Sequence, residues 1–442
     1  MTLFRFERKR NPSEVKVSQA IIVQRRKRGE RSSLSELKSL AESAGYVVVD
    51  SVEQVRSSDP GYQIGVGKAA ELAKLVHDLK ADRLIFDNSL KPIQSYNLAK
   101  ATGVEAIDRF QLILEIFAKK ASTKEAKFQV QLAKLCYQLT RARESVRLAK
   151  MGEQPGFGGL GRYEVDVYYE AIKRQITQIR GKLRSICGKR ELHRVRRLDL
   201  GFSLVSFAGY TNSGKSTLFN ALTEESVPTS LSLFTTLSTK TRAVSLNGRR
   251  ALITDTVGFI DRLPLALVES FHSTLEETIF SDVIVLVVDG SETISEIQRK
   301  TSCCFDTLRE IKAVGIPIVT ALNKIDLLKK DELKEKFSLL RGVAPNLVPI
   351  SALRRENLEE LKSEISKNLE GLEEASVVLP LGEEIMSFVS SLYDVSNVVE
   401  VRYRSETVMV RFRAQPKLMY RILERVERLG GRILRRAVRT VA

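Results

Sequence analysis

The chain is poor in the residues that build metal cages and disulfide frameworks. Its 442 residues include three histidines, four cysteines and no tryptophan. The histidines are not grouped and the cysteines lack the paired spacing of a zinc site, which argues against a structural zinc ion. The adjacent Cys303 and Cys304 fit core packing better than redox chemistry. These scarcities predict a protein of a reducing compartment without a metal cage.

Long apolar runs are missing as well. The longest purely apolar stretch runs from Val283 to Val288, whereas a helix that crosses a bilayer needs about 20 apolar residues. The first residues, MTLFRFERKR, are charged and lack the apolar stretch of a secretory signal. No repeat of 20–50 residues is visible. We therefore expect a cytoplasmic protein without a membrane span, and its length predicts roughly three domains.

Positive charge is concentrated at the N-terminal side. Residues 1–200 hold 39 Lys and Arg against 23 Asp and Glu, residues 201–372 hold 20 against 22, and residues 373–442 hold 12 against 9. Within the first part, residues 119–197 carry 20 basic and 7 acidic side chains. Solvated helix faces would predict mixed signs, so the one-sided excess predicts a polyanionic partner, RNA.

Hydrophobic periodicity divides the chain into four regions. Residues 1–118 alternate strand-like and helical stretches, which predicts an α/β domain around a mostly parallel sheet. Residues 119–200 predict a basic antiparallel helical hairpin, whose glycine-rich tip GEQPGFGGLGR (152–162) cannot stay helical. Residues 201–372 alternate strands and helices again, as an α/β nucleotide-binding domain would. Residues 373–442 predict a small α+β domain of roughly αββαβ order.

One stretch has the pattern of a phosphate-binding loop. LVSFAGYTNSGKSTLFNAL (204–222) runs from an apolar strand through a loop into a helix. The glycines let successive backbone amides point at phosphate oxygens, and the helix N-terminus adds its positive end. Lys215 is expected to reach the β and γ phosphates, and the Ser216 hydroxyl to ligate Mg²⁺. The predicted phosphate-binding residues are Gly209, Tyr210, Thr211, Asn212, Ser213, Gly214, Lys215, Ser216 and Thr217.

Two later motifs predict recognition of guanine. The strand-like IPIVTALNKID (316–326) ends in an Asn-Lys-x-Asp motif. The carboxylate of Asp326 can accept hydrogen bonds from the ring NH and the amine of guanine, which adenine cannot offer there. The aliphatic stem of Lys324 can cover the base plane, and Ser351 and Ala352 in LVPISAL (347–353) are placed to offer amides to the guanine oxygen. The predicted guanine-binding residues are Asn323, Lys324, Asp326, Ser351, Ala352 and Leu353.

Two segments complete the phosphate end of the predicted site. In ALITDTVG (251–258), Asp255 is expected to hold Mg²⁺ through water, and the amide of Gly258 to meet the γ-phosphate. The hydroxyl-rich LSLFTTLSTKTR (231–242) should supply a threonine to the Mg²⁺ ion. Thr236 is preferred over Thr235, and both segments should order around the γ-phosphate. The residues predicted to bind nucleotide here are Phe234, Thr235, Thr236, Asp255 and Gly258.

The residue after Gly258 is unusual for such a site. Related enzymes commonly place a glutamine there to orient the attacking water, whereas Phe259 has no hydrogen-bonding group. The predicted catalytic set is Lys215, Thr236, Gly258 and Phe259, with the last replacing the glutamine. Hydrolysis should then be slow in isolation and depend on a partner, a cation or the backbone. Asn212 resembles the asparagine of GTPases that bind K⁺ beside the phosphates, unless it only shapes the loop.

Together these motifs resemble the HflX family of translational GTPases. The resemblance is carried by GYTNSGKS, FTTLSTKTR, DTVGFIDRLP with the following LVESFHSTLEET, NKID and SAL. It is also carried by GVGKAAEL, IFDNSLKPIQSYNL, IDRFQLILEIFAKKA and KFQVQLAKL, so it covers about residues 20–372. It implies binding of GTP and GDP, and stimulation of hydrolysis by the ribosome. The expected partner is the large subunit with its ribosomal RNA, in rescue or splitting of ribosomes under stress.

Three points stay open within this resemblance. Some family members bind ATP through the N-terminal region. The connector GFGGLGRYEVD keeps the glycines but lacks most of the family's Thr-Arg-Gly-Pro-Gly-Glu-Thr-Gln stretch, which puts in doubt any function tied to it. The alternative functions are an RNA-associated assembly factor that binds GTP as a switch ligand with negligible hydrolysis, and an ATP-driven RNA remodeller. Family members also carry phenylalanine at the position of Phe259.

Overall fold

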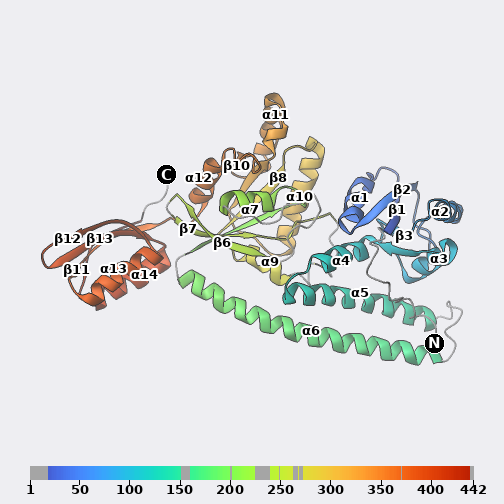
Figure 1. The fold of residues 1–442 in the computed structure, drawn as a ribbon, viewed down its shortest axis with the longest axis horizontal. Coiled ribbons are helices and arrows are strands. Elements are labelled where there is room, and N and C mark those ends of the chain that lie inside the picture. Colours follow the sequence, from blue (N-terminus) through green and yellow to red (C-terminus); the bar gives the residue numbers. More distant parts are fainter. Residues whose placement is uncertain are drawn as a thin grey trace, which may run out of the picture. The chain divides into compact units, whose positions relative to one another are not determined.

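The computed structural model of the chain describes residues 18–150, 160–199, 202–223, 239–247, 249–261, 267, 272–369 and 371–438 (Figure 1). These residues contain three separate sheets, of four, six and four strands. Each sheet has its own set of helices, and we describe each part by itself. The α/β class with mostly parallel sheets and a smaller α+β part at the C-terminal end confirms the predicted fold class.

The first sheet is parallel throughout and has the strand order β2-β1-β3-β4. Helices alternate with the strands along the chain, as the sequence predicts, and a core of apolar side chains such as Ile21, Leu72 and Phe86 fills the space between them. The elements are β1 (Ser18–Arg26), α1 (Leu34–Ser43), β2 (Tyr46–Val55), α2 (Val66–Asp78), β3 (Arg83–Phe86), α3 (Pro92–Thr102) and β4 (Glu105–Asp108).

Three helices follow: α4 (Arg109–Lys120), α5 (Lys124–Lys150) and α6 (Leu160–Asp199). The last two are the long helices predicted for the hairpin, and the Lys182 ammonium of α6 lies 5.3 Å from the ring centroid of Phe128 in α5. The predicted connector is wrong in part, because residues 160–162 already belong to α6. Residues 152–159 lie outside the described residues. Among the described helices, none is both long and apolar enough to span a bilayer.

The second sheet has the order β10-β9-β8-β5-β7-β6, and only β6 runs antiparallel to its neighbour. Its strands are β5 (Ser203–Gly209), β6 (Lys240–Leu246), β7 (Arg249–Asp255), β8 (Val283–Asp289), β9 (Ile318–Asn323) and β10 (Leu347–Pro349). Its helices are α7 (Lys215–Thr223), α9 (His272–Ile279), α10 (Ile294–Glu310), α11 (Lys330–Arg341) and α12 (Leu358–Asn368), with a 3₁₀ turn at Ile325–Leu327.

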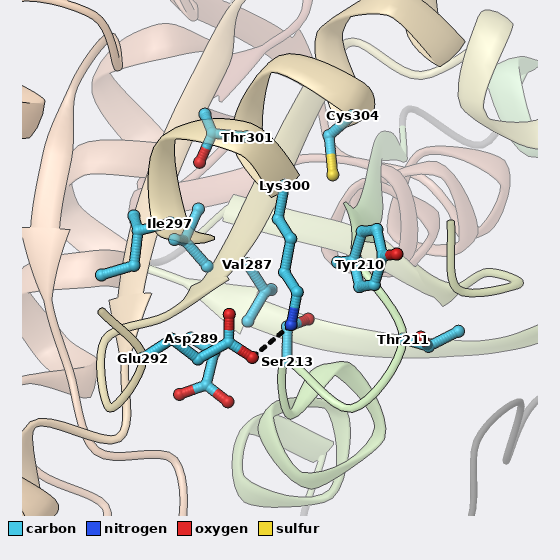
Figure 2. A pocket seen from close by; sticks show the side chains of 11 residues that line it. Tyr210, Thr211, Ser213, Val287, Asp289, Glu292, Ile297, Lys300, Thr301 and Cys304 are labelled. Atoms are coloured by element: carbon cyan, nitrogen blue, oxygen red, sulfur yellow. Dashed lines mark hydrogen bonds and ion pairs between the residues drawn. The ribbon is translucent and has the colours of Figure 1, made fainter. Parts of the chain in front are cut away.

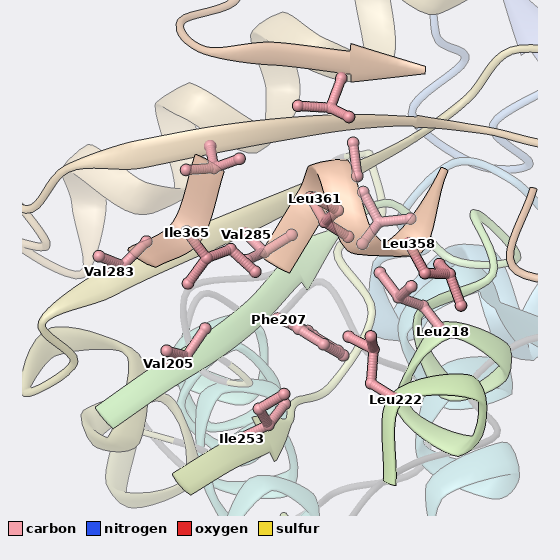
Figure 3. Close-up of a cluster of buried hydrophobic side chains, with 14 of the residues drawn as sticks. Val205, Phe207, Leu218, Leu222, Ile253, Val283, Val285, Leu358, Leu361 and Ile365 are labelled. Carbon is pink, nitrogen blue, oxygen red and sulfur yellow. The ribbon is translucent and has the colours of Figure 1, made fainter. Parts of the chain in front are cut away.

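The centre of this sheet is buried on both faces. All residues of β5 and nearly all of β8 are buried, which explains their continuous apolar sequences, since parallel strands covered by helices on both sides do not alternate. Figure 3 shows Phe207 of β5 and Val285 of β8 in a cluster with Leu218 of α7 and Leu361 of α12. This packed centre fixes the strands, and thereby the loops that follow their carboxyl ends.

The third sheet is antiparallel and has the order β12-β13-β11-β14. Its elements are β11 (Glu373–Pro380), α13 (Glu383–Val395), β12 (Asn397–Tyr403), β13 (Thr407–Ala414), α14 (Pro416–Arg428) and β14 (Arg432–Val438). The order is therefore βαββαβ, a split βαβ arrangement, and the expected αββαβ order lacks its first strand. β11 pairs with both β13 and β14 and is therefore a central strand. Its sequence EEASVVLP opens with two glutamates and ends in proline, so it does not have the pattern expected of a central strand.

Candidate nucleotide-binding site

The predicted motifs converge at one edge of the six-stranded sheet. Residues 209–216 follow β5, residues 255–259 end and follow β7, and residues 323–326 end and follow β9, while Ser351 comes shortly after β10. Because these strands are parallel, their carboxyl ends meet at the same edge, where open α/β sheets bind ligands. Residues 209–216 are called the P-loop below.

Glycine is required at both ends of the P-loop. Gly209 has φ +148°, and a Cβ atom there would lie 2.3 Å from the carbonyl oxygen of Val287. Gly214 has φ +95°, and a Cβ atom there would lie 2.2 Å from Nδ2 of Asn323. Larger residues would push the loop off β8 or the Asn323 side chain off the loop. Asn212 has φ +62°, a left-handed conformation that asparagine tolerates well, and its side chain is exposed.

Lys215 lies inside the curl of the P-loop. It is the first residue of α7 and is buried. Its Nζ donates hydrogen bonds to the carbonyl oxygens of Gly209, at 3.0 Å, and Tyr210, at 2.7 Å. Burial lowers the pKa of Lys215 to about 8, and the nearby Asp255 carboxylate opposes this shift. The ammonium is thus held at the helix N-terminus with few charged partners, which suits it to an incoming anion.

Two side-chain oxygens that suit a cation such as Mg²⁺ lie beside Lys215. The Ser216 hydroxyl donates to Oδ2 of Asp255 at 2.8 Å, and the Asp255 side chain is 0% exposed. Thr256 anchors the following turn, because its hydroxyl donates to the carbonyl oxygen of Phe207 at 2.6 Å. In the described part of the chain no group of three or more His, Cys, Asp or Glu could hold a metal ion. The pair nevertheless fits Mg²⁺, which needs one or two protein oxygens plus phosphate and water.

The DTVGF turn pairs with the P-loop through its backbone. The amide of Phe259 donates to the carbonyl oxygen of Gly209 at 2.9 Å, and the amide of Thr211 donates to the carbonyl oxygen of Phe259 at 2.8 Å. Gly258 sits so close that an added Cβ would lie 2.9 Å from Cγ2 of Thr211. The Phe259 side chain is 2% exposed. It therefore belongs to the core, and only its peptide groups face the P-loop.

Tyr210 fastens the same turn from the other side. Its hydroxyl accepts a hydrogen bond from the amide of Asp261 at 3.0 Å, and the Asp261 carboxylate pairs with Arg299 of α10. Lys300 of α10 lies over the Tyr210 ring with Nζ 4.9 Å from the centroid, and it pairs with Glu292. The Tyr210 side chain thus contacts the turn and α10, while its carbonyl contacts Lys215.

These side chains line a small pocket between the P-loop, the end of β8 and the first half of α10. Figure 2 shows Lys300 extending from α10 toward the carboxylates of Asp289 and Glu292, with Tyr210 on the opposite wall. Cys304 closes the pocket, and burial raises the pKa of its thiol to about 12. The thiol is therefore protonated at neutral pH, which agrees with a packing role for this cysteine.

The candidate guanine end is joined to the phosphate end by Asn323. This side chain is 2% exposed. Its Nδ2 donates to the carbonyl oxygen of Ser213 at 2.8 Å, and its Oδ1 accepts from the amide of Ala352 at 2.9 Å. The Ser351 hydroxyl donates to Oδ1 of Asp326 at 2.6 Å, which orients that carboxylate. Both hydrogen-bonding groups of Asn323 are used within the protein, so it serves as a clamp between two loops.

Three residues of this region were not predicted from the sequence. Asp289 pairs with Nζ of Lys324 at 2.6 Å, and its place at the end of a buried strand, on the same edge as the motifs, could have revealed it. Asp261 lies within the DTVGFIDRLP stretch but was given no role, and Arg299 belongs to no motif. Among the predicted residues, Leu353 is 76% exposed, Ser216 bonds to Asp255 and Ser351 bonds to Asp326. The amide of Ala352, predicted to face the guanine oxygen, donates to Asn323 instead. Phe234, Thr235 and Thr236 lie outside the described residues.

Comparison with known proteins finds three matching families along the chain. The family described as GTP-binding GTPase N-terminal matches residues 31–118. That described as GTP-binding GTPase Middle Region matches residues 120–197. The family described as 50S ribosome-binding GTPase matches residues 204–324, which include the P-loop and the DTVG turn.

Full-length relatives are similar over most of the chain. The protein GTPase HflX of Thermococcus kodakarensis is 44% identical over 398 residues, 88% of this chain and 90% of the relative. GTPase HflX of Methanocaldococcus jannaschii is 41% identical over 91% of this chain and 98% of the relative. GTPase HflX of Thermofilum pendens is 43% identical over 84% of this chain and 87% of the relative.

Proposed function

The chain belongs to the HflX family of GTPases and hydrolyses GTP, and from this premise we propose that its hydrolysis is controlled by the large ribosomal subunit. The matches to GTPase HflX relatives and to the three families confirm the resemblance found in the sequence. The convergence of the P-loop, the DTVG turn and the NKID motif at one sheet edge supports the GTP site. The observation that carries the proposed control is the buried Phe259, which leaves the turn without a water-orienting side chain. A matching family is described as a 50S ribosome-binding GTPase, which supports the same partner.

At the phosphate end, the P-loop amides orient the α and β phosphates, and Lys215 neutralises charge between the β and γ phosphates. The Ser216 hydroxyl would hold Mg²⁺ directly and Asp255 would hold it through water, while Thr236, the other predicted ligand, lies outside the described residues. The Mg²⁺ ion, when bound, neutralises the charge that develops on the phosphate oxygens. The hydrogen bond of 2.8 Å between Ser216 and Asp255 supports this assignment, because the two oxygens are already adjacent.

At the base end, Asp326 selects guanine by accepting from its ring NH and amine. The hydrogen bond from Ser351 uses one acceptor position of Oδ1, which leaves Oδ2 and the other position of Oδ1 for the two guanine donors. Lys324, with φ +66°, leads its side chain back to Asp289, so its stem can cover the base. A nucleobase without the donors would leave the carboxylate unpaired, at a cost of about 1–3 kcal/mol or more.

The DTVGF turn has no side chain that could orient the attacking water. Phe259 is buried, and its peptide groups already bond to Gly209 and Thr211. We infer that the isolated enzyme turns over slowly and that the ribosome supplies or exposes the missing contact. K⁺ bound beside the exposed side chain of Asn212 would be a second source of positive charge to stabilise the transition state. Equal hydrolysis rates in K⁺ and Na⁺ buffers would exclude that contribution.

Helix α6 supports docking on ribosomal RNA. Its buried seam consists of Ile172, Ile176 and Ile179, and residues 171–190 contain no acidic side chain. Arg174, Arg180 and Arg184 are exposed and make no ion pair with any residue in the described ranges. Several phosphate contacts of this kind would make ribosome binding strongly salt-dependent.

The test combines sedimentation and single-turnover hydrolysis. The full chain is sedimented with isolated large subunits in GDP, GTP and a non-hydrolysable analogue, and GTP hydrolysis is timed with and without subunits. We expect nucleotide-dependent co-sedimentation and at least tenfold faster hydrolysis, both lost in Lys215→Ala. A triple variant with Arg174, Arg180 and Arg184 changed to Gln should lose subunit binding but keep intrinsic hydrolysis.

A matched control removes three exposed charges from α11 instead: Lys330, Lys334 and Arg341, each to Gln. This control should bind subunits like the unaltered chain. Hydrolysis that no ribosomal particle accelerates would refute the coupling and favour a GTP-binding assembly factor with negligible turnover. Equal losses in the two triple variants would refute α6 as the docking element.

A further inference from the structure

The antiparallel C-terminal sheet has one face without helices. Alternate residues such as Val377, Val410 and Phe412 are buried against α13 and α14. The residues between them lie on the opposite face, because side chains alternate along a strand. On that open face three of the four strands carry arginine. We call the set Arg402, Arg411, Arg413, Arg432 and Arg435 the arginine face.

The strand register arranges these arginines in rows across the sheet. One row runs Glu400, Arg411, Ser376, Arg435. The next row runs Arg402, Met409, Val378, Arg432. Neighbouring strands are about 4.8 Å apart, so the guanidinium groups of both rows lie within one compact patch that spans the sheet from edge to edge.

The patch keeps a positive excess after its internal ion pairs are counted. Its carboxylates are Glu374 and Glu400, and Glu374 pairs with Arg413 at 2.8 Å, while Glu400 pairs with Arg411 at 3.1 Å and also with Arg402. Arg432 and Arg435 are exposed on the edge strand β14. Neither forms an ion pair with the residues that the structure describes. Arg432 and Arg435 therefore add two exposed positive charges that the ion pairs of Glu374 and Glu400 do not include.

The chemistry of the patch suits phosphate groups. Residues 373–442 contain eleven arginines and a single lysine. The planar guanidinium group binds phosphate through two parallel hydrogen bonds, which an ammonium group cannot do. No aromatic side chain lies on the open-face positions of the described strands. Bases therefore find no aromatic platform here, and contacts to the sugar-phosphate backbone should dominate.

We propose that the arginine face is a second RNA-docking surface, which binds the phosphate backbone without sequence preference. Val378 and Met409 are the apolar residues in the middle of the second row, and Arg402 and Arg432 flank them on both sides, so charge rather than an apolar surface dominates this row. The proposal does not depend on the hairpin or on GTP hydrolysis, since it rests on the C-terminal sheet alone.

The experiment measures binding of the full chain to a fluorescein-labelled 20-nucleotide oligouridylate by anisotropy between 50 and 200 mM salt. The test variant is Arg432→Gln with Arg435→Gln. Each lost phosphate contact should lower the slope of log K against log salt by about 0.7. We therefore expect a slope smaller by about 1.4 and affinity weaker by roughly tenfold at 0.1 M salt. A second variant, Arg411→Gln with Arg413→Gln, should act in the same direction.

The matched control removes two arginines from the helical side of the same domain, Arg421→Gln with Arg428→Gln, and should leave the slope unchanged. Equal slopes in test and control variants, or no binding of the oligouridylate by the unaltered chain, would overturn the proposal. A polyglutamate peptide that binds more tightly through the same arginines would assign the face to an acidic protein and also overturn it. Subunit-stimulated hydrolysis, measured on the same variants, reports separately on the proposed function.

Discussion

The clamp formed by Asn323 leads to a sharp prediction. Its side chain joins the carbonyl oxygen of Ser213 to the amide of Ala352, at 2.8 and 2.9 Å, in a position that is 2% exposed. Asn323→Ala removes both partners at once. Each buried backbone group left without a partner costs about 1–3 kcal/mol, so the free energy of unfolding should fall by roughly 2–5 kcal/mol.

The assay is calorimetric unfolding of the nucleotide-free chain together with GDP binding. A domain of about 170 residues loses about 2–4 °C per kcal/mol, so the transition should move down by roughly 5–15 °C. GDP affinity should fall as well, because the phosphate and guanine loops are no longer held in register. Asn346→Ala is the control: Asn346 also bridges elements of this domain, but it is exposed, so water replaces its bonds and the shift should stay within a few degrees.

Gly214 provides an independent check of the same contact. A Cβ atom there would lie 2.2 Å from Nδ2 of Asn323, at φ +95°. Gly214→Ala should be strongly destabilising, and part of that cost should vanish in combination with Asn323→Ala, because the clash disappears with the amide. If Asn323→Ala weakened GDP binding but left the unfolding transition in place, Asn323 would be a ligand of guanine and the clamp would be refuted.

Three further outcomes follow from the same site. The pKa of Lys215 is lowered to about 8, and bound phosphate should raise it, so GDP binding should take up protons. The expected uptake is about 0.7 proton at pH 8.5 and about 0.1 at pH 7, measured by titration calorimetry in buffers of different ionisation enthalpy. Equal uptake at the two pH values would contradict this prediction. Tyr210→Phe removes the acceptor for the Asp261 amide, so that amide should exchange hydrogen roughly fivefold faster, for about 1 kcal/mol; unchanged exchange would dismiss the contact. Phe259→Gln should not accelerate intrinsic hydrolysis and should lower stability, because it buries an amide; a tenfold faster, equally stable variant would disprove the inward orientation.

Much of the site follows from sequence because its parts are local. The P-loop, DTVG and NKID each combine a strand with the turn that follows it, and parallel strands bring their carboxyl ends together without further information. The roles of side chains that bridge distant segments do not follow in this way. Arg299 meets Asp261 only because α10 packs beside the turn, and no spacing in the sequence encodes that approach.

The same distinction explains the errors in the fold. β11 lies between β13 and β14, yet its pattern is masked by polar residues at one end and by Val378, an apolar residue on the open face. The start of α6 at Leu160 shows that glycines near a helix end do not stop it when the rest of a 40-residue helix continues. The arginine face likewise needed the strand register, because its members come from three strands that are up to 33 residues apart in the chain.

Phe259 is best understood as part of the frame of the site. Its peptide amide and carbonyl bond to the P-loop on either side of Tyr210, and its side chain fills the core. Tyr210 in turn holds Asp261, two residues further along. The turn is thus fixed to the P-loop at three points before any nucleotide enters. A water-orienting glutamine would have to replace Phe259, but the backbone of this residue pairs with the P-loop and its side chain faces the core. Phe259 therefore gives the site a rigid turn in place of a water-orienting side chain, and in the proposed function the large ribosomal subunit supplies the contact that the turn lacks.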